Sequence, residues 1–329
     1  MKNWLDMNMS MTKEKQILNP LEVHKIVSEN VKNILEEAGI PTGREIDAKE
    51  VRGEDSNSVF RIDCGSSSYA LKVFSDSNDT GQFYTNIIFN QLLLENNIPT
   101  PNIIQSSDNL DMLPAPYIVW EWFDGKPSCD IGSEKERHDI AVQTGRQLRK
   151  IHEIKIPGYG HPDIKNDWSG ENIKSVIHFF VKRIQNLIKK EGTAFSNDEF
   201  LDILRVTAES EKLLSFTEPR LLHGDITGGN IIVSDSKDIS FIDPGEIIAG
   251  DPMSDLGYSQ TTRLSPIFRK GLWEGYTKDN PLTDKEYDRF LRWRLLRQCV
   301  IVCRAFLNKD KNTETYFNDA LSFLAELKK

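Results

Sequence analysis

Apolar residues recur at helical spacing in some parts of this chain and in short extended runs in others. Between residues 21 and 38 they fall three or four positions apart, which predicts an amphipathic helix that ends at Gly39 and Pro41. Three short runs separated by turn residues then predict an antiparallel meander. These runs are residues 45–52, 59–62 and 69–74. A helix over residues 81–96 and a buried strand over residues 116–125 complete the expected N-terminal part.

Helical spacing dominates the rest of the chain. It predicts a helix over residues 134–153, two helical segments within residues 168–217 that break at Gly192, and further helices between residues 265 and 327. Five arginines alternate with apolar positions in the last region, and we expect solvated helix faces paired with acidic residues, with an anion site as the alternative. They are Arg289, Arg292, Arg294, Arg297 and Arg304. Residues 1–16 are expected to form a loose leader.

Composition and charge narrow the class of protein. The 329 residues are enough for two domains, and 38% hydrophobic with 28% charged residues is typical of a globular protein with a substantial core. A net charge of -9 argues against binding to nucleic acid and would favour a cationic small substrate. The N-terminus lacks the apolar segment of a signal peptide, and no apolar stretch is long enough for a membrane span. We therefore expect a cytoplasmic protein with no membrane association.

One segment carries the candidate chemistry. Asp225 is followed five residues later by Asn230 and then by an apolar run, and a second apolar run ends at Asp243. A hairpin of these two runs would place a base, an amide and a second carboxylate around one volume. Phosphoryl transfer needs an acceptor for the substrate hydroxyl proton and oxygen ligands for magnesium. The alternative is that Asp225 and Asn230 are ordinary turn formers, which does not explain the second aspartate.

The pattern His223-Gly224-Asp225-x4-Asn230, followed by Ile242-Asp243-Pro244-Gly245, resembles the catalytic and metal-binding segments of the aminoglycoside phosphotransferases. These are small-molecule kinases with the protein-kinase fold. Gly158-Tyr159-Gly160 and the overall spacing are similar to the hygromycin B phosphotransferase branch. The resemblance implies an α+β, bilobal fold, with an N-terminal lobe of antiparallel sheet plus helix over residues 17–121. Residues 122–329 would form a larger, mainly helical catalytic and substrate-binding lobe.

The resemblance also implies roles for particular residues. Asp225 would be the catalytic base, and Asn230 and Asp243 would hold Mg²⁺. Lys72 would pair with the nucleotide phosphates, the alternative being an edge-strand lysine that faces solvent. The turn before it and the strand that joins the lobes would supply further nucleotide contacts. These contacts are Ser56, Asn57 and Ser58 at the phosphates, and the backbone of Glu121 and Phe123 at the purine.

The chain departs from the family pattern in the helix after Lys72. A glutamate there usually pairs with the lysine, but Thr85 and Asn86 occupy the expected positions. Farther along, His152 is expected to be structural. Asp251 and Asp255 belong to a Gly-Asp-Pro-x-x-Asp-Leu segment that in the family supports the catalytic loop.

The implied function is an ATP- or GTP-dependent phosphotransferase that acts on a hydroxyl of a small, cationic molecule. An aminoglycoside-type antibiotic is the first candidate acceptor, which would give resistance by O-phosphorylation. The alternatives are a metabolite kinase on the same fold, acting on a sugar, a choline-like amino alcohol or an amino acid, and a non-catalytic nucleotide-binding protein. The missing helix glutamate is the only support for the last.

Trp120 falls where the resemblance places the residue that limits the depth of the base pocket, although Trp120 and Trp122 are equally explained as core aromatics. If Trp120 limits the pocket, Trp120→Met should change the relative use of ATP and GTP, because a flexible side chain replaces a bulky ring. Turnover with each nucleotide measures this, and an unchanged preference would reject the hypothesis.

Overall fold

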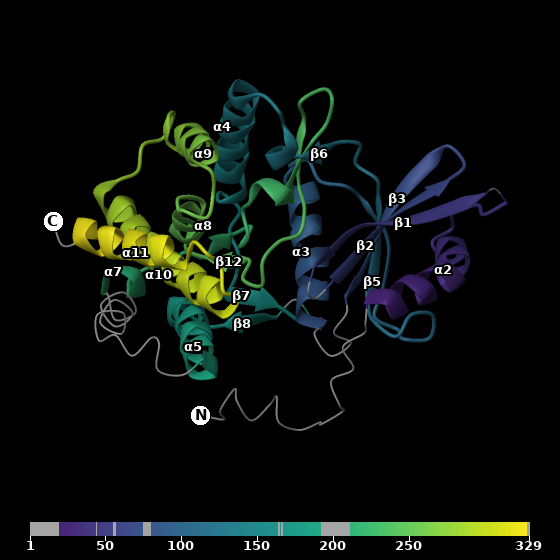
Figure 1. Ribbon diagram of the computed structural model, residues 1–329, viewed down its shortest axis with the longest axis horizontal. Helices are drawn as coiled ribbons and strands as arrows, with labels where there is room; N and C mark the ends of the chain where they lie inside the picture. The colour runs from purple at the N-terminus through teal and green to yellow at the C-terminus, as the bar shows by residue number, and fades with distance from the viewer. Residues whose placement is uncertain are drawn as a thin grey trace. The chain divides into compact units, whose positions relative to one another are not determined.

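The computed structural model describes residues 20–43, 45–54, 57–74, 80–163, 165, 167–191 and 211–327. The expected leader lies outside these residues. The chain divides into two compact units. The first comprises Met1–Ile87 and Pro101–Trp122, and the second comprises Ile88–Thr100 and Phe123–Lys329. The division after Trp122 is one residue from the expected lobe boundary, and the roles assigned to the two lobes stay predictions. Figure 1 colours the chain by residue number.

The first unit is built on a five-stranded antiparallel sheet with the strand order β1-β2-β3-β5-β4. Its strands are β1 (Ile46–Glu54), β2 (Asn57–Cys64), β3 (Ser67–Phe74), β4 (Ile103–Ser107) and β5 (Tyr117–Glu121). Every second residue of β2 is buried, so one face of the strand lies on a core. The expected meander is therefore present as β1, β2 and β3, and β3 is the central strand of the five-stranded sheet.

A helix covers part of this sheet. The apolar stripe of α2 (Pro20–Glu37) is buried in one cluster with residues from β2, β3 and β5. That stripe consists of Val23, Val27, Val31, Ile34 and Leu35. A second, smaller cluster joins Phe74 to Phe83 of α3 (Thr80–Glu95), with the two rings edge to face at 5.7 Å. Trp120 packs against this cluster and is partly buried.

The second unit is mainly helical. Its helices are α4 (Glu134–Ile151), α5 (Ile173–Glu191), α7 (Glu211–Leu214), α8 (Pro252–Ser259), α9 (Pro266–Thr277), α10 (Asp284–Leu307) and α11 (Thr313–Leu327). The second helical segment predicted after Gly192 falls mostly outside the described residues. Within the described ranges, no helix is both long and apolar enough to cross a bilayer. The expected α+β class, with sheet and helix before a mainly helical part, is confirmed.

Two small sheets accompany these helices. One has the order β11-β10-β6 and the other β8-β7-β12-β9. Their strands are β6 (Lys126–Pro127), β7 (Tyr159–Pro162), β8 (Trp168–Gly170), β9 (Arg220–Leu221), β10 (Ile231–Val233), β11 (Ile239–Phe241) and β12 (Ala249–Gly250). The antiparallel hairpin β10–β11 is the pair of apolar runs expected from the sequence. It places Asn230 directly before one strand and Asp243 two residues after the other.

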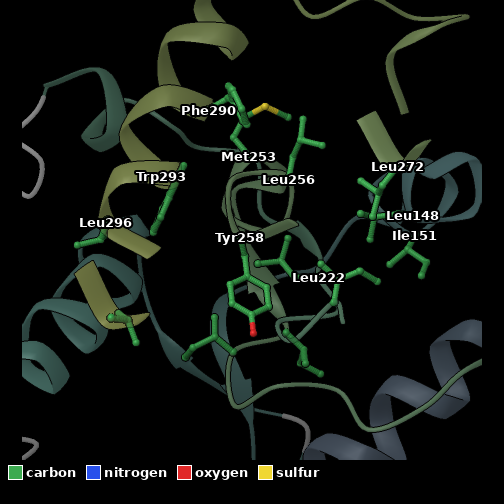
Figure 2. Close-up of a cluster of buried hydrophobic side chains, with 14 of the residues drawn as sticks. Leu148, Ile151, Leu222, Met253, Leu256, Tyr258, Leu272, Phe290, Trp293 and Leu296 are labelled. Carbon is green, nitrogen blue, oxygen red and sulfur yellow. The ribbon is translucent and has the colours of Figure 1, made fainter. Parts of the chain in front are cut away.

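Helix α10 forms the centre of the larger core. Thr283 and Glu286 make a reciprocal capping box at its start, which satisfies the first backbone N–H groups. The helix packs against α5, α8 and α11 (Figure 1). Trp293 is fully buried there, close to Phe290 of the same helix and to Met253 and Leu256 of α8 (Figure 2).

Helices α4 and α9 approach each other through glycines. A Cβ atom on Gly275 would collide with the backbone carbonyl of Val142, and one on Gly145 would collide with the carbonyl of Leu272. Only hydrogen at these positions permits such close packing of the two helices.

Gly275→Ala should therefore destabilise the protein by about 1–3 kcal/mol, the usual range for overpacking a core, even though alanine favours a helix by about 1 kcal/mol. The midpoint of urea unfolding measures the change. Gly132→Ala is the control, because no heavy atom lies within 4 Å of its added Cβ. Equal midpoints for the two variants would contradict the packing argument.

Candidate active site

The loop between β9 and β10 has a conformation that only glycine accommodates at one point. Gly224 has φ = +82°, and a Cβ atom there would collide with the carbonyl of Ile247. The backbone N–H of Gly245 donates to the carbonyl of His223 at 2.7 Å. The loop that carries Asp225 and the segment that follows β11 are thus held in direct contact.

This contact brings together the three residues that the sequence predicted for catalysis and metal binding. The side-chain amide of Asn230 donates to the backbone carbonyl of Asp225 at 2.9 Å and to its Oδ2 atom at 3.2 Å. The same Nδ2 atom lies 3.5 Å from the backbone carbonyl oxygen of Asp243, which accepts a further hydrogen bond. Asn230 is buried and Asp225 is half-buried, so the carboxylate of the expected base keeps access to solvent.

Asp243 adopts a backbone conformation that is uncommon for a residue with a side chain. Its φ is +57°, in the left-handed region, and it precedes Pro244. Such conformations cost about 1–3 kcal/mol and occur mainly where the surrounding structure or a function requires them. A hydrogen bond from the Ile242 N–H to the Asn230 carbonyl, at 3.1 Å, fixes the backbone just before the turn.

The donor set fits magnesium. Asp243 offers a carboxylate, and Asn230 directs its amide nitrogen toward Asp225, which makes its amide oxygen the atom that could serve as a ligand. Mg²⁺ prefers oxygen ligands and commonly takes one or two from the protein and others from phosphates. Among the described residues, no group of three or more His, Cys, Asp or Glu residues is arranged to hold a metal ion.

Asp255 of α8 fixes the backbone of the loop that carries Asp225. Its Oδ2 atom accepts from the backbone N–H of His223 at 2.6 Å, and its Oδ1 atom accepts from that of Gly224 at 3.0 Å. His152 Nε2 lies 3.3 Å from Oδ2, and its Nδ1 lies 2.8 Å from the hydroxyl of Tyr276. Burial alone would raise the pKa of Asp255, but the hydrogen bond and charge of His152 hold it below the ordinary value. His152 is therefore a structural histidine, as expected.

His223 is neutral in this arrangement. Burial lowers its pKa, because the charged form would lose its hydration. Its Nδ1 atom accepts from the backbone N–H of Asp225 at 3.3 Å, so the proton lies on Nε2, which donates to the carbonyl of Ile242 at 3.1 Å. The imidazole thereby links the loop to the end of β11 and takes no proton from a substrate.

Sequence reasoning did not identify Tyr258 and Arg297 as neighbours of the candidate base. The hydroxyl of Tyr258 donates to Oδ1 of Asp225 at 2.8 Å. Arg297 Nη2 donates to the Gly224 carbonyl at 2.7 Å. The spacing of Tyr258, three residues after Asp255 on one helix face, was an available signal for the tyrosine.

The expected pairing of the C-terminal arginines with acidic residues is present for Arg289, Arg292 and Arg294, but their side chains are only 13–16% exposed and not on solvated faces. Arg304 is exposed, as expected. The expectation is wrong for Arg297, which is only 8% exposed and lies against the loop that carries Asp225, because its neighbours on that helix face belong to the core. The guanidinium stays in this buried position by bonding a backbone carbonyl and stacking on aromatic rings.

The first unit holds most of the residues expected to contact nucleotide. Lys72 is 4% exposed in the central strand β3, so the alternative of an edge-strand lysine facing solvent is wrong. Its ammonium lies 5.0 Å from the centre of the Phe74 ring. Asn57 donates to the side chain of Gln82 at 3.3 Å, and Ser58 is buried. Ser56 lies outside the described residues.

The other two residues expected to contact nucleotide, Glu121 and Phe123, lie in the sequence on either side of the boundary between the units. The backbone N–H of Glu121 donates to the Asn102 carbonyl at 3.0 Å, and its carboxylate accepts from the Asn102 amide at 2.7 Å. Phe123 belongs to the second unit. Thr85 and Asn86 are the residues that stand where a glutamate was expected in α3. The side-chain amide of Asn86 donates to the Gln82 carbonyl at 2.8 Å. The hydroxyl of Thr85 is buried and has no hydrogen-bond partner among the described residues.

Comparison with known proteins identifies a sequence family and solved structures of similar fold. The sequence profile of a family described as the phosphotransferase enzyme family matches residues 47–291. A search among proteins of curated function found no matching sequence.

Three solved structures illustrate the similarity of fold. Aminoglycoside phosphotransferase APH(4)-Ia is 14% identical, with a TM-score of 0.69, over 92% of this chain and 98% of that one. A thermostable mutant of the same enzyme, in a ternary complex with ADP and hygromycin B, is 16% identical, with a TM-score of 0.67, over 89% and 97%. A predicted fructosamine-3-kinase from Haemophilus somnus 129PT is 17% identical, with a TM-score of 0.66, over 91% and 99%.

Asp255→Asn should lower the free energy of unfolding by about 3 kcal/mol at pH 7, because the charged hydrogen bonds to two backbone N–H groups are weakened in a buried site. The pKa of Asp255 is lowered in the folded protein, so its stabilisation is complete above the ordinary value of 3.8 and is lost as the pH falls below it. Urea unfolding at pH 7 and pH 3.5 should show the difference between the two proteins beginning to narrow at the lower pH, because the folded-state pKa lies lower still. Asp279→Asn, at an exposed carboxylate, is the control, and a pH-independent difference would contradict the assignment.

Proposed function

The chain belongs to the phosphotransferase enzyme family, and on that premise we propose that it transfers the γ-phosphoryl group of ATP to a hydroxyl of a small molecule. The observation that supports this most directly is the convergence of Asp225, Asn230 and Asp243 at the ends of one hairpin. A base and two oxygen ligands in one place are what phosphoryl transfer requires of a protein.

In the proposed mechanism, Asp225 accepts a hydrogen bond from the acceptor hydroxyl, orients it, and takes its proton. The new oxygen–phosphorus bond forms as the bond between the γ-phosphorus and ADP breaks, and ADP leaves. Asn230 and Asp243 would hold Mg²⁺, which neutralises charge on the nucleotide phosphates. The transition state of such transfers is loose, so positioning and electrostatic stabilisation supply most of the rate. The hydrogen bonds to the Gly224 backbone, at 3.0 and 2.7 Å, support this role, because they hold the loop that carries Asp225 in one position.

We propose that nucleotide is bound by the groups the family resemblance implies, with Lys72 at the phosphates. Ser56, Asn57, Ser58, Glu121 and Phe123 are the other proposed contacts. The position of Lys72 in the central strand of the sheet supports this, because it is not the solvent-facing lysine of an edge strand. Variants of APH(4)-Ia have been solved with ADP and with AMP-PNP, which favours ATP as the donor. GTP is the alternative donor that the Trp120 experiment tests.

Two acceptor classes are proposed in order. An aminoglycoside-type antibiotic is the first, supported by the similarity to APH(4)-Ia, which has been solved with hygromycin B, and by the net charge of -9. O-phosphorylation of such a compound would confer resistance. A metabolite such as a glycated amine, a sugar or an amino alcohol is the second, supported by the similarity to predicted fructosamine-3-kinases. We place either reaction in the cytoplasm. A non-catalytic nucleotide-binding role is disfavoured by the intact Asp225, Asn230 and Asp243.

The test is magnesium-dependent ADP release from ATP with a panel of aminoglycosides, sugars, amino alcohols, amino acids and glycated amines. Asp225→Ala should lower turnover by about 10²- to 10⁴-fold, the usual contribution of a general base, and leave ATP binding largely unchanged. Asp243→Ala should instead weaken ATP binding only when magnesium is present.

Asp235→Ala is the matched control, since this carboxylate is exposed in the turn of the same hairpin. Near-normal turnover of Asp225→Ala would reject the base. A wild-type protein that is inactive on the whole panel would reject the proposed function.

A further inference from the structure

Tyr258 makes a contact with the candidate base that no part of the proposed reaction has yet used. Its hydroxyl donates to Oδ1 of Asp225 at 2.8 Å, and the side chain is only 4% exposed. Burial, together with the charge of Asp225, raises the pKa of the tyrosine to about 12. The phenol therefore keeps its proton at neutral pH and acts as a permanent hydrogen-bond donor.

Two arginines hold the Tyr258 side chain in place, one at its ring and one at its hydroxyl. The guanidinium of Arg297 lies 4.3 Å from the ring centre, and the same group donates to the Gly224 carbonyl at 2.7 Å. Arg263 Nη1 donates to the Tyr258 hydroxyl oxygen at 3.4 Å. Figure 2 shows the side chain of Tyr258 extending from α8 among the buried side chains of the larger core. The donor thus has a fixed position relative to the loop that carries Asp225.

The two oxygens of Asp225 are consequently fixed by two different elements. Oδ1 accepts from Tyr258 of α8, and Oδ2 accepts from Asn230 at the start of the hairpin. A carboxylate with one donor on each oxygen cannot rotate without losing a hydrogen bond. A general base must be aimed at the proton that it takes.

We propose that Tyr258 is a positioning residue, which acts through Asp225 by holding its carboxylate in the orientation that phosphoryl transfer uses. This inference rests on the proposed function, because it assumes that Asp225 is the base. Tyr258 itself touches neither the nucleotide nor the acceptor in this role.

Other charged and titratable groups surround Asp225, and they do not change in the tests below. They are His223 and Asp243 from the loop and hairpin, Asp255 and Arg263 from α8 and the turn that follows it, and Arg297 and Arg304 from α10.

Tyr258→Phe removes one oxygen atom and keeps the ring that Arg297 covers. We expect kcat to fall about 10- to 100-fold, the equivalent of losing one hydrogen bond to a charged group, with the KM for ATP unchanged. The rate is measured with the first acceptor of the panel that the wild-type protein phosphorylates.

Tyr159→Phe is the matched control. Tyr159 is also buried in the second unit, but its hydroxyl donates to the backbone carbonyl of Phe216 at 3.2 Å, away from Asp225. This variant should keep the wild-type kcat and the wild-type KM for ATP. A merely structural role for Tyr258 would lower the melting temperature and leave the kcat of the folded protein unchanged, so kcat measured well below the melting temperature separates the two.

A readout without catalysis tests the contact itself. In protein labelled with ¹³Cζ-tyrosine, the resonance of Tyr258 is assigned as the one missing in Tyr258→Phe, and it should shift in Asp225→Asn. No shift would overturn the inference, and so would a Tyr258→Phe enzyme with an unchanged kcat.

A faster Tyr258→Phe enzyme would also overturn the inference, because the phenol would then be occupying the place of the acceptor hydroxyl. A wild-type chain that is inactive on every acceptor contradicts the proposed function instead, and it is recognised without any variant of Tyr258.

Discussion

The candidate active site depends on one buried carboxylate that accepts two backbone hydrogen bonds. Asp255 accepts from the N–H groups of His223 and Gly224, and a side chain with fewer than two acceptor oxygens would leave at least one of these donors without that partner. A loop with a left-handed glycine has little intrinsic preference for one conformation, so the fixed acceptor supplies the order that the loop lacks. His152 keeps the acceptor charged, and Tyr276 keeps His152 in place.

The same helices that bury this carboxylate also connect the site to the core. Asp251 begins α8 as its capping residue and accepts hydrogen bonds from Arg289 and Trp293 of α10 at 2.8 and 3.0 Å. Farther along α10, Arg297 reaches the Gly224 carbonyl. One face of α10 therefore holds the start of α8 and the catalytic loop at once. The position of Asp225 is set by helix packing and not by the loop alone.

The parts of this arrangement that the sequence predicted are those in which chemistry and spacing are local. Asp225 and Asn230 share one loop, Asp243 follows an apolar run, and the hairpin joins them. The orientation of a helix was harder to predict, because charge alone suggested that every arginine of α10 faces solvent. Arg297 is buried because three-dimensional packing overrides that preference and a carbonyl compensates its charge. In the first unit, burial of Lys72 agrees with its expected importance, but its partner cannot be predicted from a helix that offers Thr85 and Asn86.

The location of Arg297 in α10 has a consequence for biosynthesis. The His-Gly-Asp loop and its hairpin leave the ribosome well before the helix that fixes them. Until α10 has emerged, Gly224 lacks its guanidinium donor and Asp251 lacks both of its side-chain donors, so the loop is assembled only when translation has passed the end of that helix. A nonsense mutation early in α10, before Arg289, would therefore leave a chain that carries the complete sequence motif but lacks all three of these donors.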